Sequence, residues 1–220
     1  MKTVYCISGL GADERIFQNL DVTGVQFKCI NWLIPEEGES LIQYSGRMGQ
    51  LINEPLSMLM GLSFGGMVAI EICKIFSLSK VVLISSIKTR SELPLWMRTC
   101  GNLHLDAILP KKPIQSFKPI RAIRPIQNWF LGAETEDEKC LANKYRDSID
   151  PGYLKWSINQ VLNYNNDWLP AECFHIHGTN DHIFPAKNLQ ATHLIPGGGH
   201  FMVMNKHAKI SAVLHQILHS

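Results

Sequence analysis

The sequence has no long hydrophobic run and no closely spaced cysteine pair. No segment approaches the roughly 20 apolar residues that a membrane-spanning helix needs, so we expect no membrane span. The six cysteines are scattered without a CxxC pair, which is typical of free thiols in a reduced compartment. The apolar run at the N-terminus ends at Gly9 and lacks the length and the cleavage site of a secretory signal. These absences predict a cytoplasmic protein.

The chain also lacks a stripe of basic residues, and its formal net charge is only +2. The densest basic stretch, residues 111–124, is interrupted by prolines, so we expect no nucleic-acid partner. The glycine-containing stretch 8–13 has neither the lysine of a phosphate-binding loop nor the spacing of a dinucleotide-binding fingerprint. No cofactor is expected.

What the chain does have is the composition of a globular domain, with 45% hydrophobic and 18% charged residues. Short apolar runs alternate with helical stretches, which is typical of a parallel sheet covered on both faces. Strands are predicted near residues 3–8, 26–30, 57–61, 80–85, 173–177 and 191–195, and helices at 40–52, at 64–76 and in a last segment up to 218. The predicted fold class is therefore α/β, with a mostly parallel open sheet of about six strands and helices on both faces.

Residues 87–169 break this alternation because the stretch is long and rich in proline. Four of the five tryptophans lie in it: Trp96, Trp129, Trp156 and Trp168. A segment of this length between two core strands is more often a functional cap than a structureless loop. We expect a helical cap insertion at 87–169 on a core formed by 1–86 and 170–220, within a single domain. In the alternative interpretation the tryptophans only hold a small helical subdomain together.

A candidate nucleophile stands between a predicted strand and a predicted helix. The apolar run at 56–60 passes into the G-x-S-x-G pattern at 61–65, and the helical stretch follows directly. A sharp turn of this kind lifts the oxygen of Ser63 above the edge of the sheet, and its glycines allow strand and helix to approach closely. The N–H of Phe64, at the start of the helix, then points at the site and can hold a developing oxyanion. The alternative is a tight structural turn without a chemical role.

With this motif in its setting, the sequence resembles the α/β-hydrolase superfamily from the first predicted strand to the last helix. The resemblance implies a second oxyanion N–H from the residue after Gly9, which is Leu10. Ser8 stands where that family usually has histidine. The chain starts at the strand before this loop, so the two leading strands common in the family are expected to be absent. A glycine-rich turn with no role is the alternative for the loop.

The resemblance also assigns an acid and a base. The predicted strand 173–177 passes into a G-x-x-D sequence similar to the acid loop of the family, so Asp181 is expected to orient the base and stabilise its charged form. The last predicted strand is followed by three glycines and His200, which is where the chain order Ser, Asp, His puts the general base. A simple turn residue is the alternative role for Asp181.

The same region contains a rival pattern. His175, His177, Asp181 and His182 resemble the zinc motif H-x-H-x-D-H of metallo-β-lactamase-type hydrolases. Three residues separate His177 from Asp181 where that family has one, and the motif there comes early in the chain. We therefore expect no metal site, and a metal-dependent hydrolase is the remote alternative.

Together these residues predict a serine hydrolase that acts on a small-molecule substrate, a small, largely apolar carboxylic ester or thioester, through an acyl-enzyme. The tryptophans of the insertion offer large apolar surfaces over the serine, which favours an uncharged acyl or alkyl group. Lyase chemistry uses the same residues on this fold and is one alternative. A non-hydrolytic protein that binds a small ligand is another, although a pure receptor has no need of Ser63, Asp181 and His200 together.

Overall fold

The computed structural model describes residues 1–54, 58–76, 78, 80–104 and 121–219. In these residues six strands form one sheet, and every pairing between neighbouring strands is parallel. The strands are β1 (Lys2–Ile7), β2 (Val25–Ile30), β3 (Met58–Leu62), β4 (Lys80–Ile84), β5 (Glu172–Gly178) and β6 (His193–Ile195). The predicted α/β fold with a parallel sheet of about six strands is confirmed.

Each predicted strand coincides with an observed one, and the ends differ by one or two residues. The predicted strand start at Ser57 lies outside the described residues. The last strand begins at His193 rather than at Ala191, because the side chain of Thr192 bonds to the main chain of the neighbouring strand. Its Oγ1 accepts the N–H of His175 at 2.8 Å in place of a regular ladder bond.

The sheet has the strand order β2-β1-β3-β4-β5-β6. The chain passes from β1 outward to β2 and then returns to β3 on the other side of β1, so the winding reverses between β1 and β3. Such a switch point opens a crevice at the carboxyl ends of the strands, where ligands of open parallel sheets bind. The loop at 8–13 follows β1 and Ser63 follows β3, so both candidate segments lie beside this crevice.

Local sequence fixes several helix ends. Ser40 and Gln43 form a capping box at the start of α1, and Thr135 and Glu138 form another at the start of α6. Helix α5 ends at Gly132, whose φ of 72° lies in the left-handed region that glycine adopts without strain. The described helices are α1 (Leu41–Gly49), α2 (Phe64–Phe76), α3 (Leu95–Asn102), α5 (Arg124–Leu131), α6 (Glu136–Ser148), α7 (Pro151–Leu162), α8 (Met202–Asn205) and α9 (His207–His219), with the 3-10 turns η1 (Glu14–Phe17), η2 (Arg90–Glu92) and η5 (Ala186–Asn188).

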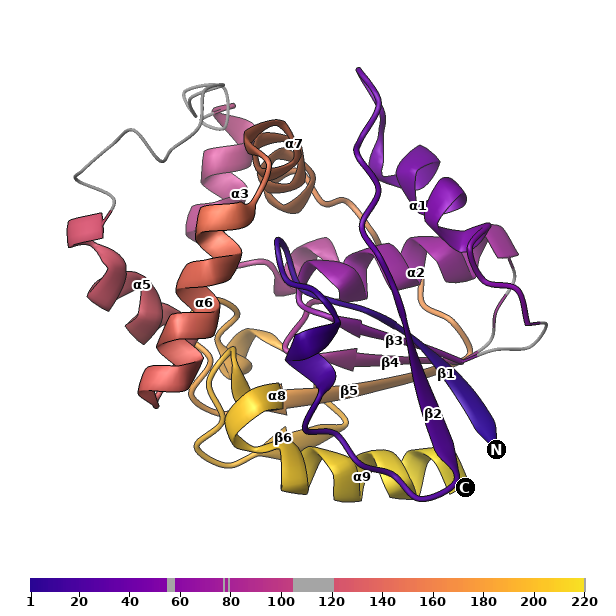
Figure 1. Cartoon of the computed structure of the whole chain (residues 1–220). Coiled ribbons are helices and arrows are strands. Elements are labelled where there is room, and N and C mark those ends of the chain that lie inside the picture. Colours follow the sequence, from indigo (N-terminus) through magenta and orange to yellow (C-terminus); the bar gives the residue numbers. More distant parts are fainter. Residues whose placement is uncertain (55–57, 77, 79, 105–120, 220) are drawn as a thin grey trace.

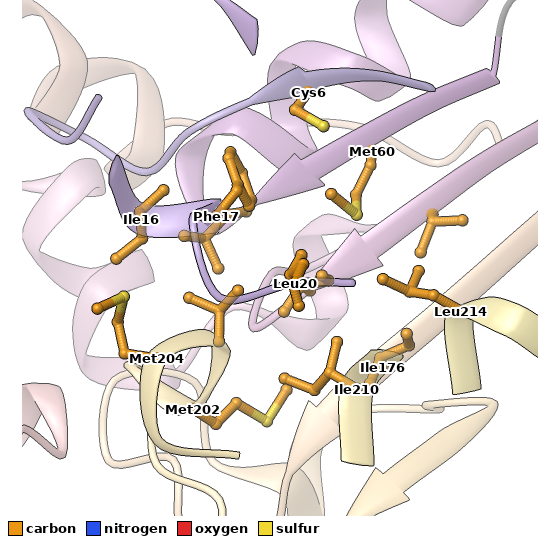
Figure 2. Close-up of a cluster of buried hydrophobic side chains, with 14 of the residues drawn as sticks. Cys6, Ile16, Phe17, Leu20, Met60, Ile176, Met202, Met204, Ile210 and Leu214 are labelled. Atoms are coloured by element: carbon orange, nitrogen blue, oxygen red, sulfur yellow. The ribbon is translucent and has the colours of Figure 1, made fainter. Parts of the chain in front are cut away.

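The helices cover both faces of the sheet (Figure 1). Successive residues of a strand point to opposite faces, and the two apolar cores follow this alternation. Val4 and Cys6 of β1 pack with α8, α9 and η1, whereas Tyr5 and Ile7 pack with α1 and α2. Figure 2 shows the first core, with Leu214 of α9 among the side chains that fill the space between helix and strands.

Between β4 and β5 the described chain forms α3, α5, α6 and α7, which lie together beyond the carboxyl ends of the strands (Figure 1). These helices belong to the stretch 87–169 that the sequence predicts as an insertion. Residues 105–120, with three of its prolines, lie outside the described residues. Within the described ranges, no helix has the length and apolar character needed to cross a membrane.

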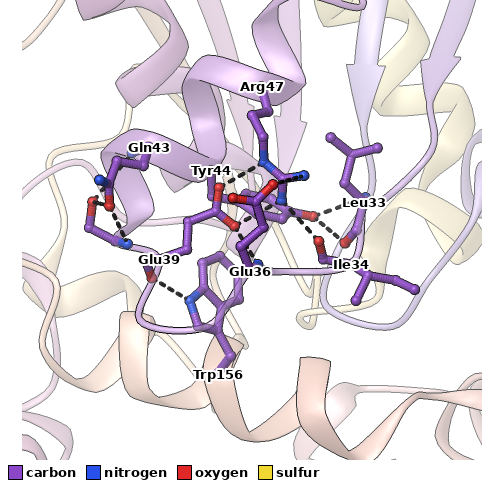
Figure 3. A network of polar contacts seen from close by, with 9 residues as sticks. Leu33, Ile34, Glu36, Glu39, Gln43, Tyr44, Arg47 and Trp156 are labelled. Atoms are coloured by element: carbon purple, nitrogen blue, oxygen red, sulfur yellow. Dashed lines mark hydrogen bonds and ion pairs between the residues drawn. The ribbon is translucent and has the colours of Figure 1, made fainter.

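Helix α7 is joined to the core by a polar network around Glu39 (Figure 3). The indole Nε1 of Trp156 donates to the main-chain O of Glu39 at 2.7 Å. The buried carboxylate of Glu39 accepts two hydrogen bonds from Arg47, each 2.8 Å long, and one from the N–H of Glu36 at 2.8 Å. The ring of Trp156 also packs against Tyr44, with the ring centroids 4.5 Å apart. Helix α7 is therefore fixed to α1 and to the loop before it.

Candidate active site

Ser63 lies at the junction of β3 and α2 in a strained backbone conformation. Its φ is 53°, in the left-handed region that residues with a side chain rarely adopt. Strain of about 1–3 kcal/mol persists at such a residue only where the surrounding structure enforces it. Here the N–H of Ser63 donates to the O of Ile84 at 2.9 Å, and the carbonyl O of Ser63 accepts the Ser86 hydroxyl at 2.7 Å. The turn is thus held from the neighbouring strand β4.

Two glycines allow the close approach that this turn requires. A Cβ on Gly61 would lie 2.4 Å from the O of Gly65, and a Cβ on Gly65 would lie 2.3 Å from the O of Ser8. Both distances are far below any ordinary van der Waals contact between these atoms. Helix α2 therefore starts directly against the end of β3 and against the loop that follows β1.

Three of the predicted side chains meet at this turn although they are far apart in the sequence. The Nε2 of His200 is 2.8 Å from the Oγ of Ser63, and its Nδ1 is 2.8 Å from the Oδ2 of Asp181. They follow β3, β5 and β6, so the carboxyl edge of the sheet supplies all three. In a neutral imidazole the Nδ1–H donates to the carboxylate, and the Nε2 lone pair is free to accept the serine O–H.

The carboxylate of Asp181 is buried and uses both of its oxygens. Its Oδ1 accepts the N–H groups of Ile183 at 2.8 Å and of Phe184 at 2.9 Å, while Oδ2 faces His200. Burial by itself would raise the pKa of Asp181, but the interactions with His200, with His177 and with the N–H of Phe184 together outweigh burial and lower that pKa. The group is therefore an ionised acceptor at neutral pH and can hold the imidazole in one orientation.

A second histidine contacts the same carboxylate. The Nε2 of His177 lies 3.3 Å from the Oδ2 of Asp181 and 2.8 Å from the O of Phe184. A carbonyl oxygen only accepts, so this Nε2 carries the proton and the Nδ1 of His177 accepts the Nε2–H of His175, 3.2 Å away. Burial lowers the pKa of both histidines, that of His175 to about 3, so both are neutral near pH 7. This contact to the acid is not predicted from the sequence.

The loop after β1 lines the same cavity as Ser63. Its turn at 9–12 is closed by a main-chain hydrogen bond of 2.9 Å and by the hydroxyl of Ser8, which donates to the main chain at 2.6 Å. Leu10 and Phe64 both line the cavity. The N–H of Phe64 belongs to the first turn of α2 and so has no acceptor within the helix. Both predicted oxyanion residues therefore line the same cavity as Ser63.

The loop that carries His200 is braced by the end of α5. The N–H of Phe201 donates to the O of Leu131 at 2.8 Å. The next residue, Gly132, is in contact with Gly199, since a Cβ on Gly132 would lie 2.9 Å from the Cα of Gly199. The main chain at the end of α5 thus lies directly against the loop that positions the imidazole.

Ser63 and His200 open into a cavity of about 940 Å³. Residues at the carboxyl ends of the strands line one part of the cavity, and residues of α3, α5, α6 and α7 line most of the rest. The lining is mainly apolar, for example Met97, Phe130 and Ile158. Cavities of this size and character are typical of sites for small organic ligands.

The four tryptophans of the insertion have different surroundings. Trp96 lines the cavity. Trp156 belongs to the junction of α7 with the core, Trp129 stacks on His182 with ring centroids 4.0 Å apart, and Trp168 is exposed. Of the four tryptophans expected over the serine, only Trp96 is among the described residues that line the cavity. The directions of the other rings depend on helix packing that the sequence pattern does not reveal.

The residues of the alternative zinc pattern do not converge on one point. His175 and His177 face each other and the buried carboxylate, whereas His182 stacks on Trp129 at the surface. Nowhere in the described part of the chain are three or more His, Cys, Asp or Glu side chains arranged to hold a metal ion.

Comparison with known proteins identifies the fold. No protein-family model and no curated protein matches the chain. Among solved structures, an esterase from Thermogutta terrifontis is 13% identical with a TM-score of 0.69, covering 100% of this chain and 90% of its own. A bromoperoxidase from Bacillus anthracis is 15% identical with a TM-score of 0.73, covering 100% and 92%. A meta-cleavage product hydrolase from Pseudomonas fluorescens is 18% identical with a TM-score of 0.63, covering 100% and 91%.

The chain therefore has the α/β-hydrolase fold, as its motifs predicted. The three neighbours are named for different reactions, so the fold does not choose among them.

Sequence reasoning missed two contacts that support the site. The i, i+2 spacing predicts that His175 and His177 share one face of a core strand, but the contact of His177 with Asp181 was not predicted. The signal for it is that this strand leads directly into the acid loop. Ser86 gives no such signal. It follows a different strand, and its hydrogen bond to Ser63 exists only through the pairing of β3 with β4.

Proposed function

We propose that this protein is a serine hydrolase that cleaves a small, largely apolar carboxylic ester or thioester through an acyl-enzyme on Ser63. The observation that carries the proposal is the hydrogen-bonded series Ser63, His200, Asp181, with 2.8 Å at each step, at the wall of an apolar cavity. A nucleophile, a base within reach of it and a group that orients the base are what acyl transfer requires.

In the proposed reaction the Oγ of Ser63 attacks the substrate carbonyl carbon while the Nε2 of His200 takes the hydroxyl proton. The carbonyl oxygen becomes an anion, and we assign its stabilisation to the N–H groups of Leu10 and Phe64. The bond from the acyl carbon to the leaving oxygen or sulfur then breaks, and His200 returns its proton to the leaving group. Water, deprotonated by the same imidazole, attacks the acyl carbon and releases the acid.

Asp181 has two tasks in this scheme. Its ionised Oδ2 holds the Nδ1–H of His200, so that Nε2 and not Nδ1 faces the serine, and its charge stabilises the imidazolium that forms. Helices α3, α5, α6 and α7 act as a cap, consistent with their share of the cavity wall. Their apolar side chains would displace water from the substrate and so strengthen the electrostatic interactions at the serine.

A fluorophosphonate probe tests the proposal directly, because it phosphonylates only an activated serine. We expect the purified protein to be labelled at Ser63 and to hydrolyse aryl esters. Ser63→Ala should keep its melting temperature but lose the label and nearly all turnover, on the order of 10⁶-fold in kcat. Ser91→Ala, which changes an exposed serine, is the matched control. Turnover in Ser63→Ala equal to that of the wild type would end the hypothesis.

A further inference from the structure

The cavity has a charged end that the proposed chemistry does not use. Among its described lining residues, the side chains that carry a fixed charge are Arg121, Arg124, Arg146 and Asp147. All of them come from α5, from α6 or from the residues just before α5, and not from the strand ends that supply Ser63. Three are cations and one is an anion, so this part of an otherwise apolar cavity is positive.

The guanidinium of Arg146 is held in place by amides and not by an acid. Its Nη1 donates to the Oδ1 of Asn128 and to the Oδ1 of Asn143, each at 2.8 Å. Asn128 is buried on α5 and Asn143 lies one turn back on α6, so the two helices fix the plane of the guanidinium. Both hydrogens of Nη1 are thereby used.

The other edge of this guanidinium remains available. Within the described chain its Nε and Nη2 donate to no protein acceptor, and neither is among the polar atoms that are buried without a partner. The Nε–H and one Nη2–H of an arginine are parallel and match the two oxygens of a carboxylate. Arg146 therefore has a preformed two-donor edge without a protein acceptor in the described chain, and it is one of the residues that line the cavity.

The charges near Arg146 have opposite signs. Asp147 forms an ion pair with Arg124 and also attracts the Arg146 guanidinium. Burial, and then the like charge of Arg124, lower the pKa of Arg146 and outweigh the opposite effect of Asp147, although a guanidinium stays protonated at any physiological pH. A half-buried cation with another cation beside it gains more from an incoming anion than an exposed lysine would.

We propose that the substrate carries a carboxylate on its apolar part, remote from the ester bond, and that Arg146 binds this carboxylate. The inference rests on the proposed ester hydrolysis at Ser63 and specifies its substrate class. The apolar lining still holds the carbon chain of the substrate. The sequence favours an uncharged acyl or alkyl group, and the inference replaces it with a group that ends in a carboxylate. Hydrolysis consumes one water: a half-ester of a dicarboxylic acid yields a dicarboxylate and an alcohol, and an ester of an ω-hydroxy acid yields a carboxylate and the hydroxy acid.

Two matched series of esters test this. In the first, aryl half-esters of straight dicarboxylic acids are compared with aryl esters of monocarboxylic acids of equal carbon number. In the second, acetate esters of ω-hydroxy acids are compared with acetates of plain alcohols, which moves the carboxylate to the alcohol side. The measured quantity is the ratio of kcat/KM for the charged and the neutral ester. In the wild type we expect a ratio of at least about ten at the best chain length in one series, falling as ionic strength rises.

Three variants locate the effect. Arg146→Gln should lower the ratio about tenfold or more, and Arg146→Lys should keep part of it, because the charge stays but the two-donor edge is lost. Asn143→Asp places a carboxylate beside the guanidinium without removing it and should also lower the ratio. Lys144→Gln removes an exposed positive charge from the same helix and should leave the ratio unchanged.

A ratio near one in the wild type in both series, or a high ratio that survives both Arg146→Gln and Asn143→Asp, would overturn the inference. In either case hydrolysis of the neutral esters leaves the proposed function standing. Absence of hydrolysis of every ester, with no probe label, would instead refute the proposed function. If Arg146→Gln does not fold, calorimetric titration of Ser63→Ala with the dicarboxylates decides: we expect binding that Asn143→Asp weakens, and no binding would contradict the role of Arg146.

Discussion

Replacing Asp181 by asparagine tests the geometry of the candidate site most sharply, because it changes one atom and almost no volume. The asparagine Oδ1 can keep both main-chain hydrogen bonds, from Ile183 and Phe184. The new NH2 group then takes the place of Oδ2, where it faces the Nδ1 of His200 at about the present 2.8 Å. The protonated Nε2 of His177, which donates to the O of Phe184, also lies 3.3 Å from that position. The NH2 group of the asparagine and the Nδ1–H of His200 are both hydrogen-bond donors, so the hydrogen bond between these positions is lost.

The imidazole of His200 can relieve this conflict only by moving its proton. Nδ1 becomes an acceptor for the new NH2 group, and Nε2 takes the hydrogen and turns it toward the Oγ of Ser63. The base is then blocked. A misplaced tautomer in this kind of triad lowers kcat by about 10⁴-fold, which corresponds to about 5.4 kcal/mol on the barrier.

The assay is kcat for an aryl ester under saturating conditions, with a thermal melt to show that Asp181→Asn is folded. Asp167→Asn is the control. Asp167, like Asp181, lies shortly before a proline, but it is exposed in the loop before β5. Removing its carboxylate should change kcat by less than about tenfold. Equal losses in the two variants, or near-normal turnover in folded Asp181→Asn, would refute the tautomer argument.

Three further predictions concern stability and specificity. Burial lowers the pKa of His175 to about 3, below its unfolded value of about 6.5. The contribution of this group to stability is therefore complete above pH 6.5 and is lost at about 1.4 kcal/mol per pH unit as the pH falls toward 3. In His175→Leu the free energy of unfolding in urea should depend less on acid pH, and an unchanged pH dependence would argue against a neutral buried ring. Gly65→Ala should lose more than about 2 kcal/mol, because its Cβ would meet main-chain oxygen at 2.3 Å, whereas Gly46→Ala, with 3.7 Å to its nearest neighbour, should be neutral or stabilising. Trp96→Ala should shift the chain length at which kcat/KM peaks and Trp168→Ala should not; identical profiles would remove Trp96 from the substrate pocket.

Local patterns were sufficient for the sheet and for the order of the site residues. The elbow at Ser63 is encoded within five residues, because the turn needs glycine at fixed offsets, and the fold then requires its partners to follow later strands. Asp181 and His200 could be placed for that reason. The boundary of β6 was less predictable, since it depends on a side chain of Thr192 that bonds across to β5.

The parts that the sequence could not give all depend on how the insertion packs. The two-donor edge of Arg146 exists because Asn128 on another helix takes one side of the guanidinium. The same holds for the ring of Trp156, which turns to Glu39 and not to the cavity. Helical periodicity says which residues share a face of a helix, but not which neighbour that face will meet.

The contact of Leu131 and Gly132 with the loop 199–201 bears on how this fold could be recombined. The helices proposed to form a cap are an obvious segment to exchange with another protein of this fold. The end of α5 shares a main-chain hydrogen bond with the residue after His200. A foreign segment would therefore have to reproduce that contact to keep the imidazole in its position beside Ser63. A chimaera joined only at the ends of β4 and β5 should therefore be inactive on every substrate, and one that retains residues 131–132 offers the better starting point.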